Sequence, residues 1–139
     1  MSEGPRHPHR FERLRRRAEF VAVGKGVRVR REAFGLQARP RADAADEAPR
    51  YGITVTKKTA PRAVDRNRMR RRLRDALRRG AALSGVAGHD YVIVGRLELL
   101  VVPFGTLQNA LASALAEVQH KIGRRAPARV DRSAKEAGA

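Results

Sequence analysis

The stretch RNRMRRRLRDALRR, Arg66–Arg79, decides how this chain is organised. Its apolar residues recur at helical spacing and share one stripe: Met69, Leu73, Ala76 and Leu77. This period predicts a helix over Arg66–Arg79, with Asp65 as its N-cap and Gly80 as its stop. The apolar stripe therefore predicts that one face of the helix packs on a core.

Basic residues cover the opposite face of this helix. Four side chains fall within an arc of roughly 60°, with Arg68 and Arg70 on its flanks: Asn67, Arg71, Arg74 and Arg78. Like charges three and four residues apart destabilise a helix unless an anion is bound between them. Guanidinium groups bind phosphates through two hydrogen bonds and stack on bases, so the row favours an RNA-binding face. A solvated basic helix is the alternative.

Charge is distributed unevenly along the 139 residues. The formal net charge is +17, from 31 Lys and Arg against 14 Asp and Glu. Between Lys57 and Arg79 there are 11 basic residues and two acids, whereas Gly80 to His120 holds a single basic residue, Arg96. A segregated positive charge indicates a polyanionic partner, and we expect one half of the chain to bind it while the other half builds the core.

Composition excludes several classes of protein. The chain has no cysteine, which excludes disulfides, thiolate zinc sites and cysteine nucleophiles. No apolar run approaches the roughly 20 residues of a membrane span, and the N-terminal residues lack an apolar signal segment, so we expect a cytoplasmic protein with no membrane contact. The histidines are isolated from other ligands, and no catalytic motif is present. We predict no catalytic and no metal-binding side chains.

Hydrophobic patterning outside the basic stretch predicts the remaining elements. We expect helices at about Leu14–Val23 and Thr106–Gly123, and strands at Val27–Arg30, Phe34–Arg39, Tyr51–Thr56 and Tyr91–Val94. The order αβββαβα predicts an α/β fold, a two-layer α/β sandwich on a small four-stranded sheet. A single domain at 11–123 is expected between mobile basic tails at 1–10 and 124–139, with a solvated loop at Pro40–Arg50.

Phe20 has an unusual place in the first predicted helix. The expected apolar stripe holds Leu14, Ala18, Val21 and Ala22. Phe20 projects nearly opposite that stripe, beside Arg13, Arg16 and Arg17. The ring is either a platform on which bases stack or a residue that packs under a neighbouring loop.

Two consecutive blocks carry a family resemblance: GITVTKK, Gly52–Lys58, and AVDRNRMRRRLRDALR, Ala63–Arg78. Together they resemble the protein family of bacterial ribonuclease P. RLRRRAEF, Arg13–Phe20, is similar to the first helix of that family, and HDYVIVGR, His89–Arg96, to its last strand. The likeness spans about residues 13 to 120. It departs from the family in the TAPRAVD loop, at Gly24 in place of a second aromatic residue, and in LELLVV after Arg96.

The resemblance implies a mixed sheet whose parallel strands are joined by a crossover through the Arg-rich helix. It also implies an accessory subunit of an RNA-cleaving endonuclease, in which a catalytic RNA uses Mg²⁺, held mainly by the RNA, to remove the 5′ leader of precursor tRNA. The protein would be monomeric in a 1:1 complex with ribonuclease P RNA. Residues implied to bind that RNA are Lys57, Lys58, Arg66, Asn67, Arg68, Arg70, Arg71, Arg74 and Arg78. Residues implied to line a leader cleft are Arg13, Arg16, Arg17, Phe20, Thr54 and Thr56.

Two rival functions share some of these features. A ribosomal or other structural RNA-binding protein would have the same charge and fold class. A stand-alone nuclease is the second rival, and it would cleave RNA without an RNA subunit.

Overall fold

A mixed β-sheet forms the centre of the computed structural model, which describes residues 12–41, 47–80 and 85–138, the last part from 125 onward as backbone only. The strands lie in the order β1-β4-β5-β3-β2. Their bounds are β1 Glu12–Arg13, β2 Val27–Arg30, β3 Phe34–Pro40, β4 Arg50–Thr54 and β5 His89–Gly95. The four longer strands are those that the sequence predicts, and the two-residue β1 extends the sheet to five.

The sheet contains both parallel and antiparallel pairs. β4 pairs with β5 in parallel, and the chain between them forms α2, Ala63–Arg78, so the expected crossover through the Arg-rich helix is confirmed. β3 is antiparallel to both β5 and β2. β1 runs parallel to β4 and pairs with it only at Arg50 and Tyr51. The α/β fold class with a mixed sheet is confirmed.

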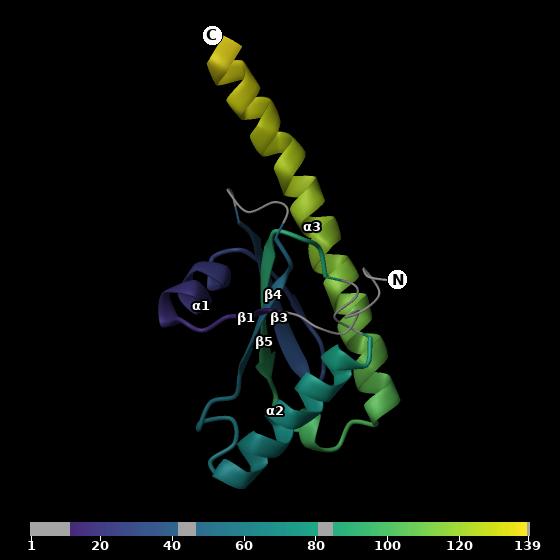
Figure 1. The fold of residues 1–139 in the computed structure, drawn as a ribbon. Coiled ribbons are helices and arrows are strands. Elements are labelled where there is room, and N and C mark those ends of the chain that lie inside the picture. Colours follow the sequence, from purple (N-terminus) through teal and green to yellow (C-terminus); the bar gives the residue numbers. More distant parts are fainter. Residues whose placement is uncertain (1–11, 42–46, 81–84, 139) are drawn as a thin grey trace, which may run out of the picture.

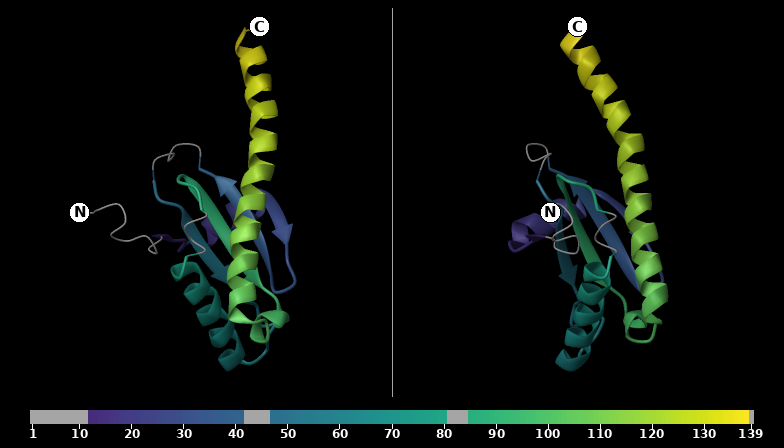
Figure 2. Two further views of the ribbon diagram at one scale, coloured as in Figure 1. Left: turned by 90° about the vertical axis from the view of Figure 1, so that its right-hand side faces the viewer. Right: turned by 45° about the vertical axis from the view of Figure 1, so that its right-hand side comes forward.

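Helices lie on both faces of the sheet (Figure 1). α2 and the long α3, Phe104–Gly138, pack against each other on one face, and α1, Arg17–Gly24, lies on the other (Figure 2). The sequence predicts two layers, and α1 adds a short third layer. Within the described residues no helix is both long and apolar enough to cross a membrane.

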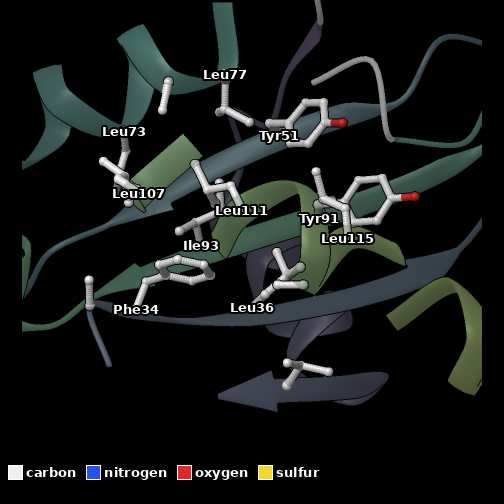
Figure 3. Close-up of a cluster of buried hydrophobic side chains, with 14 of the residues drawn as sticks. Phe34, Leu36, Tyr51, Leu73, Leu77, Tyr91, Ile93, Leu107, Leu111 and Leu115 are labelled. Atoms are coloured by element: carbon white, nitrogen blue, oxygen red, sulfur yellow. The ribbon is translucent and has the colours of Figure 1, made fainter. Parts of the chain in front are cut away.

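The main core fills the space between the sheet and the α2–α3 layer (Figure 3). α2 buries the predicted stripe completely, with Met69, Leu73, Ala76 and Leu77 at 0% exposure. The rings of Tyr51 and Tyr91 on neighbouring strands stack at 5.1 Å. A second, smaller cluster on the α1 face contains Leu14, Val23, Val92, Phe20 and Val94. Burial thus fixes α2 with its basic face outward.

The structure corrects the first predicted helix. α1 begins at Arg17 because the Glu19 side chain accepts hydrogen bonds from the backbone N–H groups of Arg15 (2.9 Å) and Arg16 (3.0 Å), which is the carboxylate half of a capping box. Leu14 therefore lies before the helix, buried on the sheet. The predicted apolar stripe is wrong, because Val21 is 50% exposed while Phe20 and Val23 face the sheet.

The ends of the other two helices also differ from the sequence predictions. Arg62, not Asp65, is the N-cap residue of α2, and Asp65 lies in its first turn. The predicted end of α3 near Gly123 is wrong, because the helix continues to Gly138; a single exposed glycine costs a helix only about 1 kcal/mol and need not end it. The departure LELLVV forms a 3-10 helix, η3 Leu97–Leu100, that leads into α3.

Candidate RNA-binding site

The outer face of α2 carries guanidinium groups that the fold leaves in solvent. Arg68, Arg71 and Arg78 are exposed, as is Asn67. In the part of the chain that the structure describes, no carboxylate pairs with any of these three arginines. Their positive charge is therefore available to a polyanion.

Repulsion within this row is evident at Arg74, which is half-buried one turn along from Arg71. Burial lowers the pKa of Arg74, and the charges of Arg13, Arg78 and Arg70 lower it further. The guanidinium stays charged, but its charge is less stable there than in water. An anion bound beside Arg74 would offset both the cost of burying its charge and the repulsion from the neighbouring arginines.

Two other arginines of α2 hold neighbouring loops in place. Arg66 donates hydrogen bonds of 2.8 Å to the carbonyl oxygens of both Ala60 and Pro61. Arg72 donates one of 2.7 Å to the Leu99 carbonyl, which fixes η3 against α2. The helical period cannot separate such structural arginines from free ones, because the partners come from outside the helix.

The loop between β4 and α2 has a defined turn at its start. The Thr56 hydroxyl accepts a hydrogen bond from the Thr59 N–H (3.2 Å), and the Ala60 N–H donates to the Thr56 carbonyl (3.0 Å). Lys57 and Lys58 lie at the exposed tip of this turn. The turn and the Arg66 contacts together keep both lysines beside the start of α2.

A cleft opens beside Phe20 at the exposed edge of β4. It has a volume of about 130 Å³ and is lined by Arg13, Leu14, Phe20, Tyr51, Gly52, Ile53, Arg70 and Arg74. Phe20 comes from the α1 layer, and Arg70 and Arg74 come from α2 on the opposite side of the sheet. Three arginines therefore line the cleft together with two aromatic residues, of which Tyr51 is 1% exposed and Phe20 is only partly buried, and the lining holds no carboxylate.

Both the opening of the cleft and the position of the Phe20 ring follow from β4. β1 ends after two residues, and the Leu14 N–H donates the last hydrogen bond of this edge, to the Tyr51 carbonyl (3.0 Å). A Cβ atom at Gly52 would lie 2.5 Å from Cε2 of Phe20, so the ring rests directly on the strand backbone. A glycine inside a strand often marks such a close approach, and this signal was present in the sequence.

Ion pairs hold α1 against the sheet. Arg50 on β4 donates two hydrogen bonds to Asp90 on β5 (2.9 and 2.8 Å) and one to Glu19 of α1 (3.0 Å). Asp90 is only 5% exposed, and Arg41 Nε lies 2.9 Å from its Oδ1. Because Glu19 precedes Phe20, the network fixes the ring relative to β4.

The structure brings some of the predicted cleft residues together and leaves others apart. Arg13 and Phe20 line the cleft, whereas Arg16 and Arg17 are exposed outside its lining. Thr54 and Thr56 are also outside the lining: Thr54 pairs with Val94 on the α1 face of the sheet, and Thr56 belongs to the turn. Sequence reasoning did not predict that Arg70 and Arg74 line the cleft, because they reach it from α2 around the edge of the sheet. Among the described residues, no three histidine or acidic side chains lie together as a metal site requires.

An α/β protein with unpaired arginines along the outer face of α2 and an arginine-lined cleft beside an aromatic ring belongs to the class of RNA-binding proteins. Comparison with known proteins then defines the family. The Ribonuclease P family model matches residues 9–119. The ribonuclease P protein component of Erythrobacter litoralis is 41% identical over 110 residues, 79% of this chain and 88% of its own. That of Brucella suis is 42% identical over 106 residues, 72% and 74% of the two chains.

Solved structures agree with this match. The RNase P protein from Thermotoga maritima has a TM-score of 0.61 at 29% identity, covering 75% of this chain and 94% of that one. The RNase P protein of Staphylococcus aureus also has a TM-score of 0.61, at 25% identity. The chain belongs to the ribonuclease P protein family. It is a subunit of the tRNA-processing, RNA-cleaving ribonuclease P holoenzyme and works with ribonuclease P RNA.

Proposed function

We propose that the two basic surfaces divide the work of the subunit. The outer face of α2 and the Lys57–Lys58 turn bind the catalytic RNA, and the Phe20 cleft binds the single-stranded 5′ leader of precursor tRNA. The observation that carries the proposal is the combination at the cleft: the partly exposed ring of Phe20, three arginines and an open strand edge. Aromatic stacking with backbone neutralisation is how proteins hold single strands without reading their sequence.

The charge of the cleft also bears on where Mg²⁺ binds. Divalent cations take oxygen ligands, above all carboxylates. The cleft lining holds three arginines and no acidic residue, so its residues do not fit Mg²⁺. We assign the metal ions and the hydrolysis to the RNA subunit, and binding to the protein. A 1:1 complex in the cytoplasm completes the proposal.

Leader recognition can be tested with the reconstituted holoenzyme. The wild type should bind precursor tRNA more tightly than mature tRNA. Loss of the ring in Phe20→Ala should remove stacking worth about 1–3 kcal/mol per base, which is roughly a 5- to 150-fold loss of affinity for the precursor alone. Val21→Ala is the matched control, because Val21 is the next residue of α1 and is 50% exposed outside the cleft lining.

Three outcomes would refute the assignment. Equal affinity of the wild type for precursor and mature tRNA would show that the protein does not bind the leader. An unchanged preference of Phe20→Ala for the precursor would show that the Phe20 ring does not contribute to leader binding. Cleavage by protein freed of all RNA would place the chemistry in the protein.

A further inference from the structure

Phe104, the first residue of α3, carries an aromatic ring that the core covers only in part. Phe34, Tyr51 and Tyr91 are at most 1% exposed. Of the phenylalanine and tyrosine rings in the described residues, only those of Phe20 and Phe104 remain partly exposed. α1 and α3 lie on opposite faces of the sheet (Figure 2), so these two rings belong to separate surfaces. Phe104 is therefore an aromatic surface outside the leader cleft.

Arg79 lies over the Phe104 ring. It is the C-cap residue of α2, and its Cζ atom lies 5.7 Å from the ring centroid, within the roughly 6 Å of a cation–π contact. Arg79 is exposed, and no carboxylate pairs with it in the part of the chain that the structure describes. The ring therefore orients the guanidinium without cancelling its charge, which lowers the entropy cost of binding a ligand there.

The described surface around this pair is open. Pro103, Gly105 and Thr106 flank the ring along the chain and are exposed. Among the described residues, a Cβ atom placed on Gly105 would meet no atom of a neighbouring element within 4 Å. The first turn of α3 contains no acidic residue. A planar group with a neighbouring phosphate can therefore approach this side of the pair without repulsion from a carboxylate.

The pair lies at one end of the exposed arginines of α2. Arg78, the residue before Arg79, is one of the three exposed arginines that no carboxylate neutralises among the described residues. Arg68 lies about three turns before Arg79, roughly 16 Å along the axis and on nearly the same side of the helix. An RNA that binds along the outer face of α2 therefore reaches the pair of Arg79 and Phe104.

The chemistry of the pair fits a nucleobase. Unpaired bases in RNA loops and bulges are held by stacking on aromatic rings and on guanidinium planes, whereas the bases of a paired helix already stack on each other. We propose that Arg79 and Phe104 form a stacking site for an unpaired base of ribonuclease P RNA. This inference rests on the proposed binding of that RNA by α2 and adds a base contact to the phosphate contacts. The leader is not the source of the base, since the Phe20 ring lies on the other face of the sheet.

Affinity for ribonuclease P RNA in a filter-binding assay is the first test. Arg79→Lys keeps the charge but removes the guanidinium plane. It should weaken binding roughly five- to tenfold, the lower end of the effect of losing one stacked base. The salt dependence should stay the same, because no charge is lost. Phe104→Leu keeps an apolar side chain without a ring and should cause a similar loss.

Arg124→Lys is the matched control. Arg124 is an exposed arginine of the same helix, and it lies about 30 Å along α3 from Phe104. Its replacement by lysine should change the affinity less than about twofold, because it keeps the charge that a phosphate would need. A thermal unfolding curve for each variant separates a loss of folding from a loss of binding.

Fluorescence reports on the site directly. The sequence contains no tryptophan, so Phe104→Trp introduces a single reporter. Tryptophan forms the strongest cation–π contacts of the aromatic residues, so Arg79 keeps its partner. The fluorescence should be quenched when ribonuclease P RNA binds and unchanged when a fully paired RNA duplex is added, because the duplex offers no unpaired base. Adding precursor tRNA to the holoenzyme should cause no further change.

Several results would overturn the stacking site. One is an affinity of Arg79→Lys that matches the wild type, and another is an equal loss in Arg124→Lys. A lower melting temperature without a loss of affinity would show that the pair only joins α2 to α3. Fluorescence that does not respond to ribonuclease P RNA, or responds only to precursor tRNA, would exclude a base of the RNA subunit. Unchanged RNA affinity when Arg68→Ala and Arg71→Ala are combined would instead refute RNA binding by α2, on which this inference rests.

Discussion

Replacing Gly52 by alanine tests the contact that shapes the leader cleft. The new Cβ would lie 2.5 and 2.7 Å from two ring carbons of Phe20 and 3.2 Å from Cδ1 of Leu14. Carbon atoms in contact prefer about 3.5–4.0 Å, so the ring must move by about 1 Å or more. Overpacking of this kind costs about 1–3 kcal/mol of unfolding free energy. Gly52 does not have a positive φ, so backbone strain adds nothing to this cost.

A double-mutant cycle isolates this contact. Urea unfolding of the wild type, Gly52→Ala, Phe20→Ala and the double variant gives the interaction between the two positions. Once the ring is absent, the methyl group has room, and alanine should be neutral or slightly better than glycine in the strand. We expect a coupling of at least about 1 kcal/mol. The same cost for Gly52→Ala with and without the ring would refute the contact.

Three further variants test the surroundings of the site. Arg68→Ala with Arg71→Ala should leave the free protein as stable as before or a few tenths of a kcal/mol more stable, because like charges are removed, while affinity for ribonuclease P RNA in a filter-binding assay falls. Hydrogen bonds from backbone N–H groups lower the pKa of Glu19. The ionised carboxylate therefore stabilises the fold at pH values above the ordinary pKa of Glu, and this stabilisation is lost as the pH falls through the lowered pKa. Glu19→Gln should therefore lower the melting temperature at neutral pH and have a smaller effect at about pH 3. Asp90→Asn should cost about 3 kcal/mol in urea unfolding, since Arg50 loses its buried partner.

The sequence was most informative where local spacing decides the structure. The apolar stripe of α2 predicted both the helix and its buried face, because that face is defined by four residues of the helix itself. The unbroken apolar run Tyr91–Val94 likewise predicted β5, the central strand of the sheet. The two-residue β1 carries no pattern that could reveal it.

The position of Phe20 shows why the face of α1 could not be predicted correctly. The helical projection included Leu14, but the Glu19 side chain starts the helix at Arg17 and leaves Leu14 outside. When the helical projection contains only the residues of α1, its buried face is the one that carries Phe20 and Val23. The sequence left two interpretations of the Phe20 ring. The structure shows the ring packed on Gly52, while stacking on bases stays a prediction.

The salt dependence of RNA binding tests most directly whether the bare guanidinium groups of α2 bind ribonuclease P RNA. Each phosphate contact contributes about 0.7–0.9 to the slope of log affinity against log salt concentration. Combining Arg68→Ala, Arg71→Ala and Arg78→Ala should reduce that slope by about 2. A control with equal net charge, Lys25→Ala, Arg39→Ala and Arg124→Ala, removes exposed cations outside α2 and should reduce it less. An unchanged slope in the α2 variant, or an equal change in both, would contradict this role for α2.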